Sequence, residues 1–314
     1  MKIIFFGSPI YTIRIIDQIK SSKNELLAIV TQNEKKGKRG KIQKTPVEIY
    51  AKENLIKFFT PEKINDKKFI TDIKQQNPDL FIIFAYGKIL PLELINIPKH
   101  GCLNIHASLL PKWRGAAPIQ RCILNRDKKT GITFFKIDEE LDKGDIIASH
   151  ELEILDDDDN LTLQSKLSKL ASDYLEDSLK KIVTNANFIK QNESESSYAK
   201  KILKNESKIE WTDSADNIVL KIKAFSGWPV VEAKILGESI KIWSAEAVEV
   251  EDECVAGKIV NLDKNGLSVS TSKGILCIKK LQFPGKKIIT ARDLCNSNSG
   301  FATKIKDKIK HKMV

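Results

Sequence analysis

Two polar side chains in a strand-like segment, Asn104 and His106, have the chemistry to stabilise a developing oxyanion. They lie two residues apart, so both side chains point to the same face of an extended strand. Residues 108–111 (Ser-Leu-Leu-Pro) end the strand, which places the pair at its carboxyl end, where open α/β sheets bind ligands. A single histidine on a buried strand is usually structural, but this placement favours a functional role.

An acidic loop after the next predicted strand offers a partner for the imidazole. Residues 141–145 read LDKGD, at a similar edge of the sheet. A carboxylate there can pair with His106 and favour its charged form. Aspartates in acidic loops are usually solvated, and spacing alone leaves Asp142 and Asp145 as rivals for this role.

The first predicted strand is followed by one glycine, Gly7. A dinucleotide-binding turn needs two more glycines, so NAD and FAD are not expected. The five cysteines are dispersed without CxxC spacing, which argues against a disulfide framework and a zinc site, and favours a reducing cytoplasm. These cysteines are Cys102, Cys122, Cys254, Cys277 and Cys295. No metal is expected.

The net charge of +11 over 314 residues favours a polyanionic partner, with nucleic acid ahead of a membrane. The chain is also rich in Lys, Ile and Asn, as an AT-biased genome makes it. Lysine accumulates in such sequences without having a function. Charge alone therefore leaves nucleic-acid binding open. No apolar run approaches the roughly 20 residues that span a bilayer, so we expect no membrane association, and we expect a monomer.

Strand-like and helix-like segments alternate in the first half, which predicts an α/β domain with a largely parallel, Rossmann-like sheet. One predicted helix, Pro46–Glu53, has Thr45 as N-cap and Glu48 to close a capping box. A long helix is expected from Asn160 to Val183. The predicted strands are Lys2–Gly7, Leu26–Thr31, Ile56–Thr60, Asp79–Ala85, Gly101–His106, Gly131–Asp138 and Ile146–Leu155.

The second half begins with a polar segment, 184–207, which reads as a linker. Five closely spaced strands then predict a small β-barrel of the oligonucleotide-binding (OB-like) kind. We therefore expect domains over 1–183 and 208–314, and a frayed helix over Lys304–Lys312. The five strands are Val230–Ile235, Ser239–Val250, Lys258–Leu262, Leu267–Ser272 and Ile275–Phe283, with a hairpin turn at 264–266.

The segment 33–44 (NEKKGKRGKIQK) is a basic loop punctuated by glycines. Charge runs of this kind are usually solvated surface loops. They can also approach a phosphate backbone, because the lysines and the arginine attract it and the glycines let the chain adapt.

Taken together, Asn104-x-His106, 108–111 (SLLP) and 141–144 (LDKG) resemble the folate-dependent formyltransferases. The segment 113–119 (WRGAAPI) narrows the resemblance to the branch that acts on methionyl-tRNA. The first strand, 85–91 (AYGKILP), Trp228-Pro229 and 285–287 extend the similarity over nearly the whole chain.

The resemblance implies a catalytic trio of Asn104, His106 and Asp142, which decides between the two aspartates. It implies 10-formyltetrahydrofolate as formyl donor and initiator methionyl-tRNA as acceptor, in translation initiation. The implied folate-binding residues are Ser108, Leu109, Leu110 and Pro111, together with the backbone around Ile89 and Leu90.

In this family a loop at the position of 33–44 enters the tRNA acceptor stem, and its arginine matches Arg39. Lys38 and Lys41 flank it, although the sequence around Arg39 departs from the commoner family pattern. Two alternatives stay open: a formyltransferase for a small amine, such as a nucleotide sugar or glycinamide ribonucleotide, and a non-catalytic RNA-binding protein. The basic loop and second domain weigh against the first, and the intact trio weighs against the second.

Overall fold

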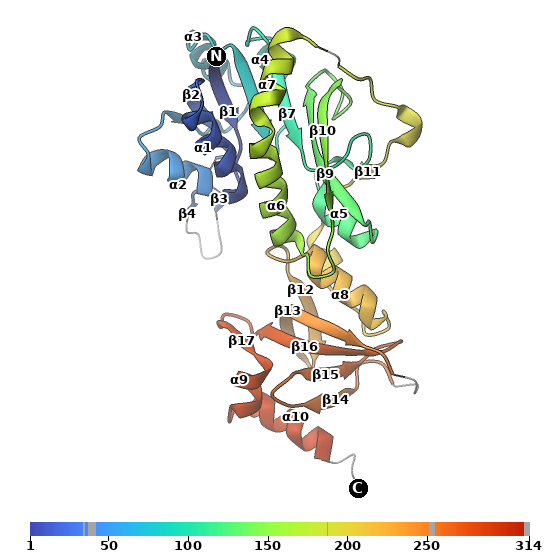
Figure 1. The fold of residues 1–314 in the computed structure, drawn as a ribbon. Coiled ribbons are helices and arrows are strands. Elements are labelled where there is room, and N and C mark those ends of the chain that lie inside the picture. Colours follow the sequence, from blue (N-terminus) through green and yellow to red (C-terminus); the bar gives the residue numbers. More distant parts are fainter. Residues whose placement is uncertain (34, 37–41, 187, 251–254, 311–314) are drawn as a thin grey trace. The chain divides into compact units, whose positions relative to one another are not determined.

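A computed structural model describes residues 1–33, 35–36, 42–186, 188–250 and 255–310, and the chain forms two compact units (Figure 1). Unit 1 comprises Met1–Ile119, Lys128–Leu155 and Thr162–Lys201, and unit 2 comprises Gln120–Asp127, Asp156–Leu161 and Ile202–Val314. Within the described ranges, no helix has the length and apolar character to cross a membrane.

Unit 1 is built on a seven-stranded sheet in the order β10-β9-β7-β6-β1-β2-β5. The five strands from β7 to β5 run parallel, whereas β9 and β10 are antiparallel at one edge. A largely parallel, Rossmann-like sheet was predicted and is confirmed. In chain order the strands are β1 (Lys2–Phe6), β2 (Glu25–Val30), β5 (Phe58–Phe59), β6 (Leu80–Phe84), β7 (Cys102–His106), β9 (Lys129–Lys136) and β10 (Ile146–Glu153).

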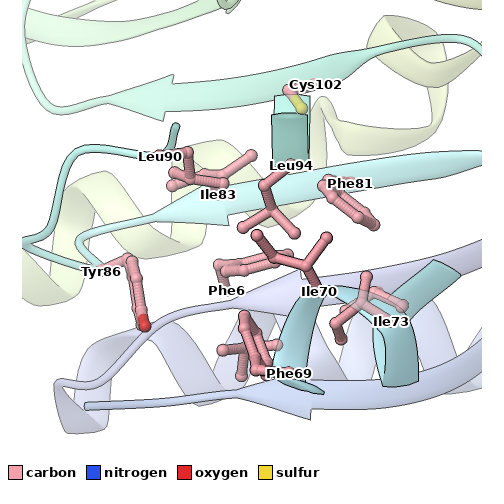
Figure 2. Packing of buried hydrophobic residues seen from close by; sticks show 12 residues of the cluster. Phe6, Phe69, Ile70, Ile73, Phe81, Ile83, Tyr86, Leu90, Leu94 and Cys102 are labelled. Carbon is pink, nitrogen blue, oxygen red and sulfur yellow. The ribbon is translucent and has the colours of Figure 1, made fainter. Parts of the chain in front are cut away.

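Helices cover both faces of this sheet. On one face, α3 and α4 enclose a cluster of buried side chains that includes Phe6, Phe69, Phe81 and Leu94 (Figure 2). Because side chains alternate along a strand, Ile3 and Phe5 point to the other face. The helices are η1 (Ile10–Thr12), α1 (Ile13–Ser21), α2 (Pro46–Glu53), α3 (Lys67–Gln75), α4 (Leu92–Ile95), α5 (Pro118–Leu124), α6 (Asn160–Asp173) and α7 (Leu175–Thr184).

Two helix details differ from expectation. The Thr45 side chain caps α2 by accepting from the Glu48 N–H, but the Glu48 carboxylate bonds to Lys52 at 2.6 Å and does not complete a capping box. The predicted long helix is divided into α6 and α7 at Tyr174. This residue leaves the helical conformation (φ −105°, ψ 6°), and its ring stacks on His150 with 3.6 Å between centroids.

The polar segment predicted as a linker, 184–207, contains ordered elements that belong to unit 1. Strand β11 (Tyr198–Ala199) pairs in parallel with β8 (Arg114–Gly115), and Ile189 bridges to Ile146. Two short 3-10 helices lie in the same segment, η3 (Glu193–Glu195) in unit 1 and η4 (Lys204–Ser207) in unit 2. The part of this segment up to Lys201 is therefore packed on the first unit.

Unit 2 contains a six-stranded antiparallel sheet in the order β12-β13-β16-β15-β14, with β17 beside β16. The turn predicted at 264–266 connects β14 to β15, with Leu262 opposite Leu267. An antiparallel sheet is established, and its closure into an OB-like barrel stays a prediction. Its elements are α8 (Ala215–Ala224), β12 (Val231–Ile235), β13 (Glu238–Val248), β14 (Ile259–Leu262), β15 (Leu267–Ser270), β16 (Ile275–Gln282), β17 (Ile288–Thr290), α9 (Ala291–Asn296) and α10 (Gly300–Lys310).

The C-terminal helix α10 is docked, so the prediction of a frayed helix over Lys304–Lys312 is wrong at Ile305, which is buried. Residues 311 and 312 of that range lie outside the described residues. Phe301, Ala302 and Ile305 are buried, and the Phe301 ring meets Phe283 edge-on at 5.0 Å. Their spacing of three and four residues places these side chains on one helical face. Hydrophobic burial therefore fixes the helix to unit 2 although lysines fill its other face.

Replacing Ile305 with alanine should lower the free energy of unfolding by about 2–5 kcal/mol, because a fully buried side chain (0% exposed) is truncated. Chemical denaturation of the full chain measures this change. Lys304→Ala, at an exposed position of the same helix, should change it by less than about 0.5 kcal/mol. Equal stability of Ile305→Ala and the wild type would restore the frayed-end interpretation.

Candidate active site

Strand β7 presents Asn104 and His106 from the middle of the sheet. It lies between parallel β6 and antiparallel β9, with Asn104 opposite Phe135 and His106 opposite Thr133. His106 is buried, whereas Asn104 is partly exposed. Among the described residues, no hydrogen bond from the Asn104 side-chain amide to another protein group is found. This amide is therefore available to a ligand.

The His106 ring is oriented by a backbone carbonyl. Its Nε2 lies 2.8 Å from the Trp113 oxygen. A carbonyl oxygen only accepts hydrogen bonds, so Nε2 carries a proton and donates it. The other ring nitrogen, Nδ1, is consequently the atom at which His106 can gain or release a proton.

Asp142 faces that second nitrogen. Its Oδ2 is 3.8 Å from His106 Nδ1, and both side chains are largely buried, at 10% and 7% exposed. The same oxygen accepts a 2.7 Å hydrogen bond from the Gly115 N–H. A separation of 3.8 Å permits ionic attraction but is too long for a hydrogen bond, so Nδ1 can still donate to a bound group.

The rival aspartate has a different environment. Asp145 contributes its backbone oxygen to the Lys136 N–H at 3.0 Å, as part of the turn between β9 and β10. Within the described part of the chain, no ion pair joins its carboxylate to His106. Of the two rivals, the structure therefore brings Asp142 beside the imidazole.

Arg114 adds a buried positive charge that is linked to the Asp142 loop through Gln191. Its side chain is 0% exposed and forms a bidentate pair with Glu193 at 2.9 and 3.0 Å. Hydrogen bonding from Arg114 holds the pKa of Glu193 below its usual value. The guanidinium also donates to Gln191, which in turn donates to the backbone of the Asp142 loop.

Gln191 and Glu193 were not predicted from the sequence. Both lie in the polar segment interpreted as a linker, 77 and 79 residues from Arg114. One signal was available. A buried arginine requires a charged or polar partner, and Arg114 belongs to the segment WRGAAPI that narrows the family resemblance.

The predicted folate-binding residues after β7 form a fixed turn. Ser108 is buried, and its hydroxyl donates to the Lys112 oxygen at 2.6 Å. The Leu110 N–H donates to Thr133 Oγ1 at 3.0 Å, and the Leu110 side chain packs into a small cluster. Leu109 and Pro111 lie in the same turn, so the segment 108–111 has a defined backbone at the carboxyl end of β7.

The second predicted folate segment follows β6, the parallel neighbour of β7, so both turns leave the same edge of the sheet. The Ile89 side chain is 78% exposed. The Leu90 side chain is 7% exposed and belongs to the core cluster of Figure 2. Leu90 can therefore meet a ligand only through its backbone, as the sequence comparison implied.

The proposed tRNA-binding residues Lys38, Arg39 and Lys41 lie outside the described residues. The structure describes the two ends of their segment, where β3 (Lys35–Lys36) pairs with β4 (Ile42–Gln43) in antiparallel register. This short ribbon lies between β2 and α2 in the chain.

No cluster of three or more potential metal ligands occurs among the residues that the structure describes. Within those ranges Cys102, Cys277 and Cys295 are free thiols.

Both units match known sequence families. Residues 1–179 match the family model described as formyl transferase, and residues 201–299 match that of the formyl transferase C-terminal domain. Together the two models span most of the chain.

Relatives are similar to this chain over almost their full length. A methionyl-tRNA formyltransferase of Sulfurihydrogenibium sp. (strain YO3AOP1) is 42% identical over 297 residues, covering 93% of this chain and 96% of that protein. One of Alkaliphilus oremlandii is 38% identical over 301 residues, with 95% and 97% covered.

Solved structures share the fold. HypX from Aquifex aeolicus in complex with tetrahydrofolic acid has a TM-score of 0.68 at 16% identity, over 94% of this chain and 47% of that one. Methionyl-tRNA formyltransferase from Clostridium thermocellum has a TM-score of 0.57 at 19% identity, with 78% and 93% covered.

Proposed function

Because this chain belongs to the formyl transferase family, and within it to the methionyl-tRNA formyltransferases, we propose that Asn104, His106 and Asp142 catalyse its reaction. The enzyme transfers the formyl group of 10-formyltetrahydrofolate to the free amino group of initiator methionyl-tRNA. The observation that carries the proposed roles is the approach of Asp142 to His106 Nδ1 at 3.8 Å, beside Asn104.

The proposed chemistry begins with attack of the methionyl amine on the formyl carbon. A new C–N bond forms while the formyl oxygen gains negative charge. The Asn104 amide and the His106 Nδ1–H donate hydrogen bonds to this oxygen, which lowers the barrier. Both groups lie on one face of β7, so they can converge on a single atom.

Completion of the transfer requires proton movement. The bond from the formyl carbon to the folate nitrogen breaks, the attacking amine releases one proton and the folate nitrogen gains one. Asp142 orients the imidazole and, with His106, relays this proton, directly or through water. Residues of the chain thus supply donors and a relay without a metal.

We propose that the folate donor binds along the shared edge of β6 and β7, against Ser108, Leu109, Leu110 and Pro111 and the backbone around Ile89 and Leu90. Support comes from the two turns at that edge and from the polar backbone groups they carry.

The proposed domain organisation is a catalytic domain over 1–183, a connecting segment over 184–207 that is packed on the first unit as far as Lys201, and a tRNA-binding, OB-like domain over 208–314. The antiparallel sheet of unit 2 and the net charge of +11 support this assignment. We also propose a monomeric, cytoplasmic enzyme, in keeping with the free thiols.

Arg39→Ala should lower kcat/KM for methionyl-tRNA by about tenfold or more and leave binding of the folate donor unchanged. The reason is that a bidentate cation for the phosphate backbone is lost while the sheet edge stays intact. Lys38→Ala and Lys41→Ala should act more mildly and mainly through salt-dependent affinity, with the larger loss at low salt. Steady-state formylation and folate titration of the same proteins measure both effects. If all three variants formylate tRNA like the wild type at physiological salt, this loop does not bind tRNA.

A further inference from the structure

The side-chain amide of Gln191 uses its full hydrogen-bonding capacity at the active site. Its Oε1 accepts from Arg114 Nε at 3.0 Å and from Arg114 Nη2 at 2.8 Å. Its Nε2 donates to the backbone oxygens of Asp142 at 2.9 Å and Gly144 at 2.8 Å. Two acceptor and two donor positions are therefore all satisfied by groups near the catalytic trio.

Only one orientation of this amide fits its surroundings. A guanidinium only donates hydrogen bonds and a backbone carbonyl only accepts them, so the oxygen must face Arg114 and the NH₂ must face the loop. A carboxylate at position 191 would satisfy the arginine but oppose the two carbonyls. A hydrocarbon would satisfy neither side.

The loop held by Gln191 has an unusual backbone. Asp142 has φ = 53°, in the left-handed region, where a residue with a side chain persists only when its surroundings fix it. Gly144 packs so closely that a Cβ there would lie 1.7 Å from the Lys136 oxygen. This conformation points the Asp142 carboxylate at the Gly115 N–H and His106.

Arg114 and its neighbour Gly115 both act on Asp142. Its buried guanidinium orients Gln191, and its pair with Glu193 keeps the charge satisfied. The next residue, Gly115, donates its N–H directly to the Asp142 carboxylate. Residues 114 and 115 therefore act on Asp142 twice, through Gln191 on its backbone oxygen and through Gly115 on its side chain.

We propose that Gln191 is a positioning residue for the formyl transfer: oriented by Arg114, it holds the Asp142 loop in the conformation that presents the carboxylate to His106. This inference rests on the catalytic role proposed for Asp142. It assigns part of the active site to the segment between α7 and β11.

The decisive experiment is a double-mutant cycle on the full-length enzyme, with kcat and KM measured for formylation of methionyl-tRNA by 10-formyltetrahydrofolate. Q191L should lower kcat by about a hundredfold, as misplacement of a catalytic group by about 1 Å does, and change the donor KM little. In the D142N background, the same substitution should lower kcat by less than about threefold, because residues that act as one unit are not additive.

Two further variants separate positioning from stability. Q191E keeps both bonds to Arg114 and loses both donors to the loop, so its kcat should also fall by about a hundredfold. It takes the place of Q191L in the test if Q191L does not fold. K190A removes an exposed neighbour for which no side-chain hydrogen bond or ion pair is found among the described residues, and should behave as the wild type. Thermal denaturation establishes that each variant is folded.

If the fold-loss in kcat of the double variant equals the product of the two single losses, the inference is overturned. Wild-type kcat in folded Q191L and Q191E would also overturn it. If D142N is impaired and the Gln191 variants are not, the positioning role alone fails. If D142N itself retains wild-type kcat, the catalytic role of Asp142 fails and the inference falls with it.

Discussion

Replacing His106 with alanine is expected to lower kcat for formyl transfer by about a hundredfold or more, while the protein still folds and still binds the folate donor. The substitution removes the Nδ1 donor that faces Asp142 and the ring that the Trp113 carbonyl orients. The interaction is strongest when the formyl oxygen becomes charged, so the loss should appear in kcat and only weakly in the donor KM.

His150→Ala provides the matched control for this substitution. His150 also belongs to unit 1, but it stacks on Tyr174 at 3.6 Å and has no contact with the trio in the described structure. We expect lower thermal stability and wild-type kcat for this variant. Wild-type kcat in His106→Ala, or an equal loss in both variants, would contradict the catalytic assignment.

Asp142→Asn is expected to have the second large effect, a fall in kcat of about a hundredfold. The amide oxygen can still accept from the Gly115 N–H, so the shape of the loop is kept. The negative charge beside His106 Nδ1 is lost, and with it the relay of protons, so the dependence of kcat on pH should change. Steady-state rates over a range of pH, with the donor KM measured in parallel, test both statements.

Asp145→Asn is the control for Asp142→Asn, because it removes a negative charge from the same loop but not the charge beside His106. The structural role of Asp145 is its backbone bond to Lys136, which the substitution preserves. Its kcat should therefore stay close to that of the wild type. Greater damage from Asp145→Asn than from Asp142→Asn would mean that the motif has been assigned to the wrong carboxylate.

The strands formed from short apolar runs could be predicted from the sequence. The strands that were predicted lie within about two residues of their predicted bounds, because each is a short apolar run between turn residues. The short strands β3, β4, β8, β11 and β17, of two or three residues each, were not predicted. The spacing of Asn104 and His106 placed both on one face of β7, and Ser108–Pro111 placed them at its end. These features depend on neighbours in the chain, which a sequence displays directly.

Other features depend on contacts that the sequence does not display. Gln191 lies in a polar segment without hydrophobic periodicity, and its partner Arg114 is 77 residues away. The direction of the Asp142 carboxylate depends on a left-handed backbone at that residue, which spacing does not reveal, so only the family resemblance distinguishes Asp142 from Asp145. In α10 the lysines masked a short apolar face, Phe301–Ile305, whose four-residue spacing was the available signal.

The most direct test of the account is formylation of charged initiator methionyl-tRNA by the wild-type enzyme, with and without 10-formyltetrahydrofolate. We expect formyl-methionyl-tRNA to accumulate only with the donor, and at least about a hundredfold more slowly with His106→Ala. Glycinamide ribonucleotide and an amino-sugar nucleotide, offered as acceptors at the same concentration, should react far more slowly than the tRNA. Formylation of a small amine in preference to methionyl-tRNA, or no transfer to tRNA by enzyme that binds the folate, would contradict the account.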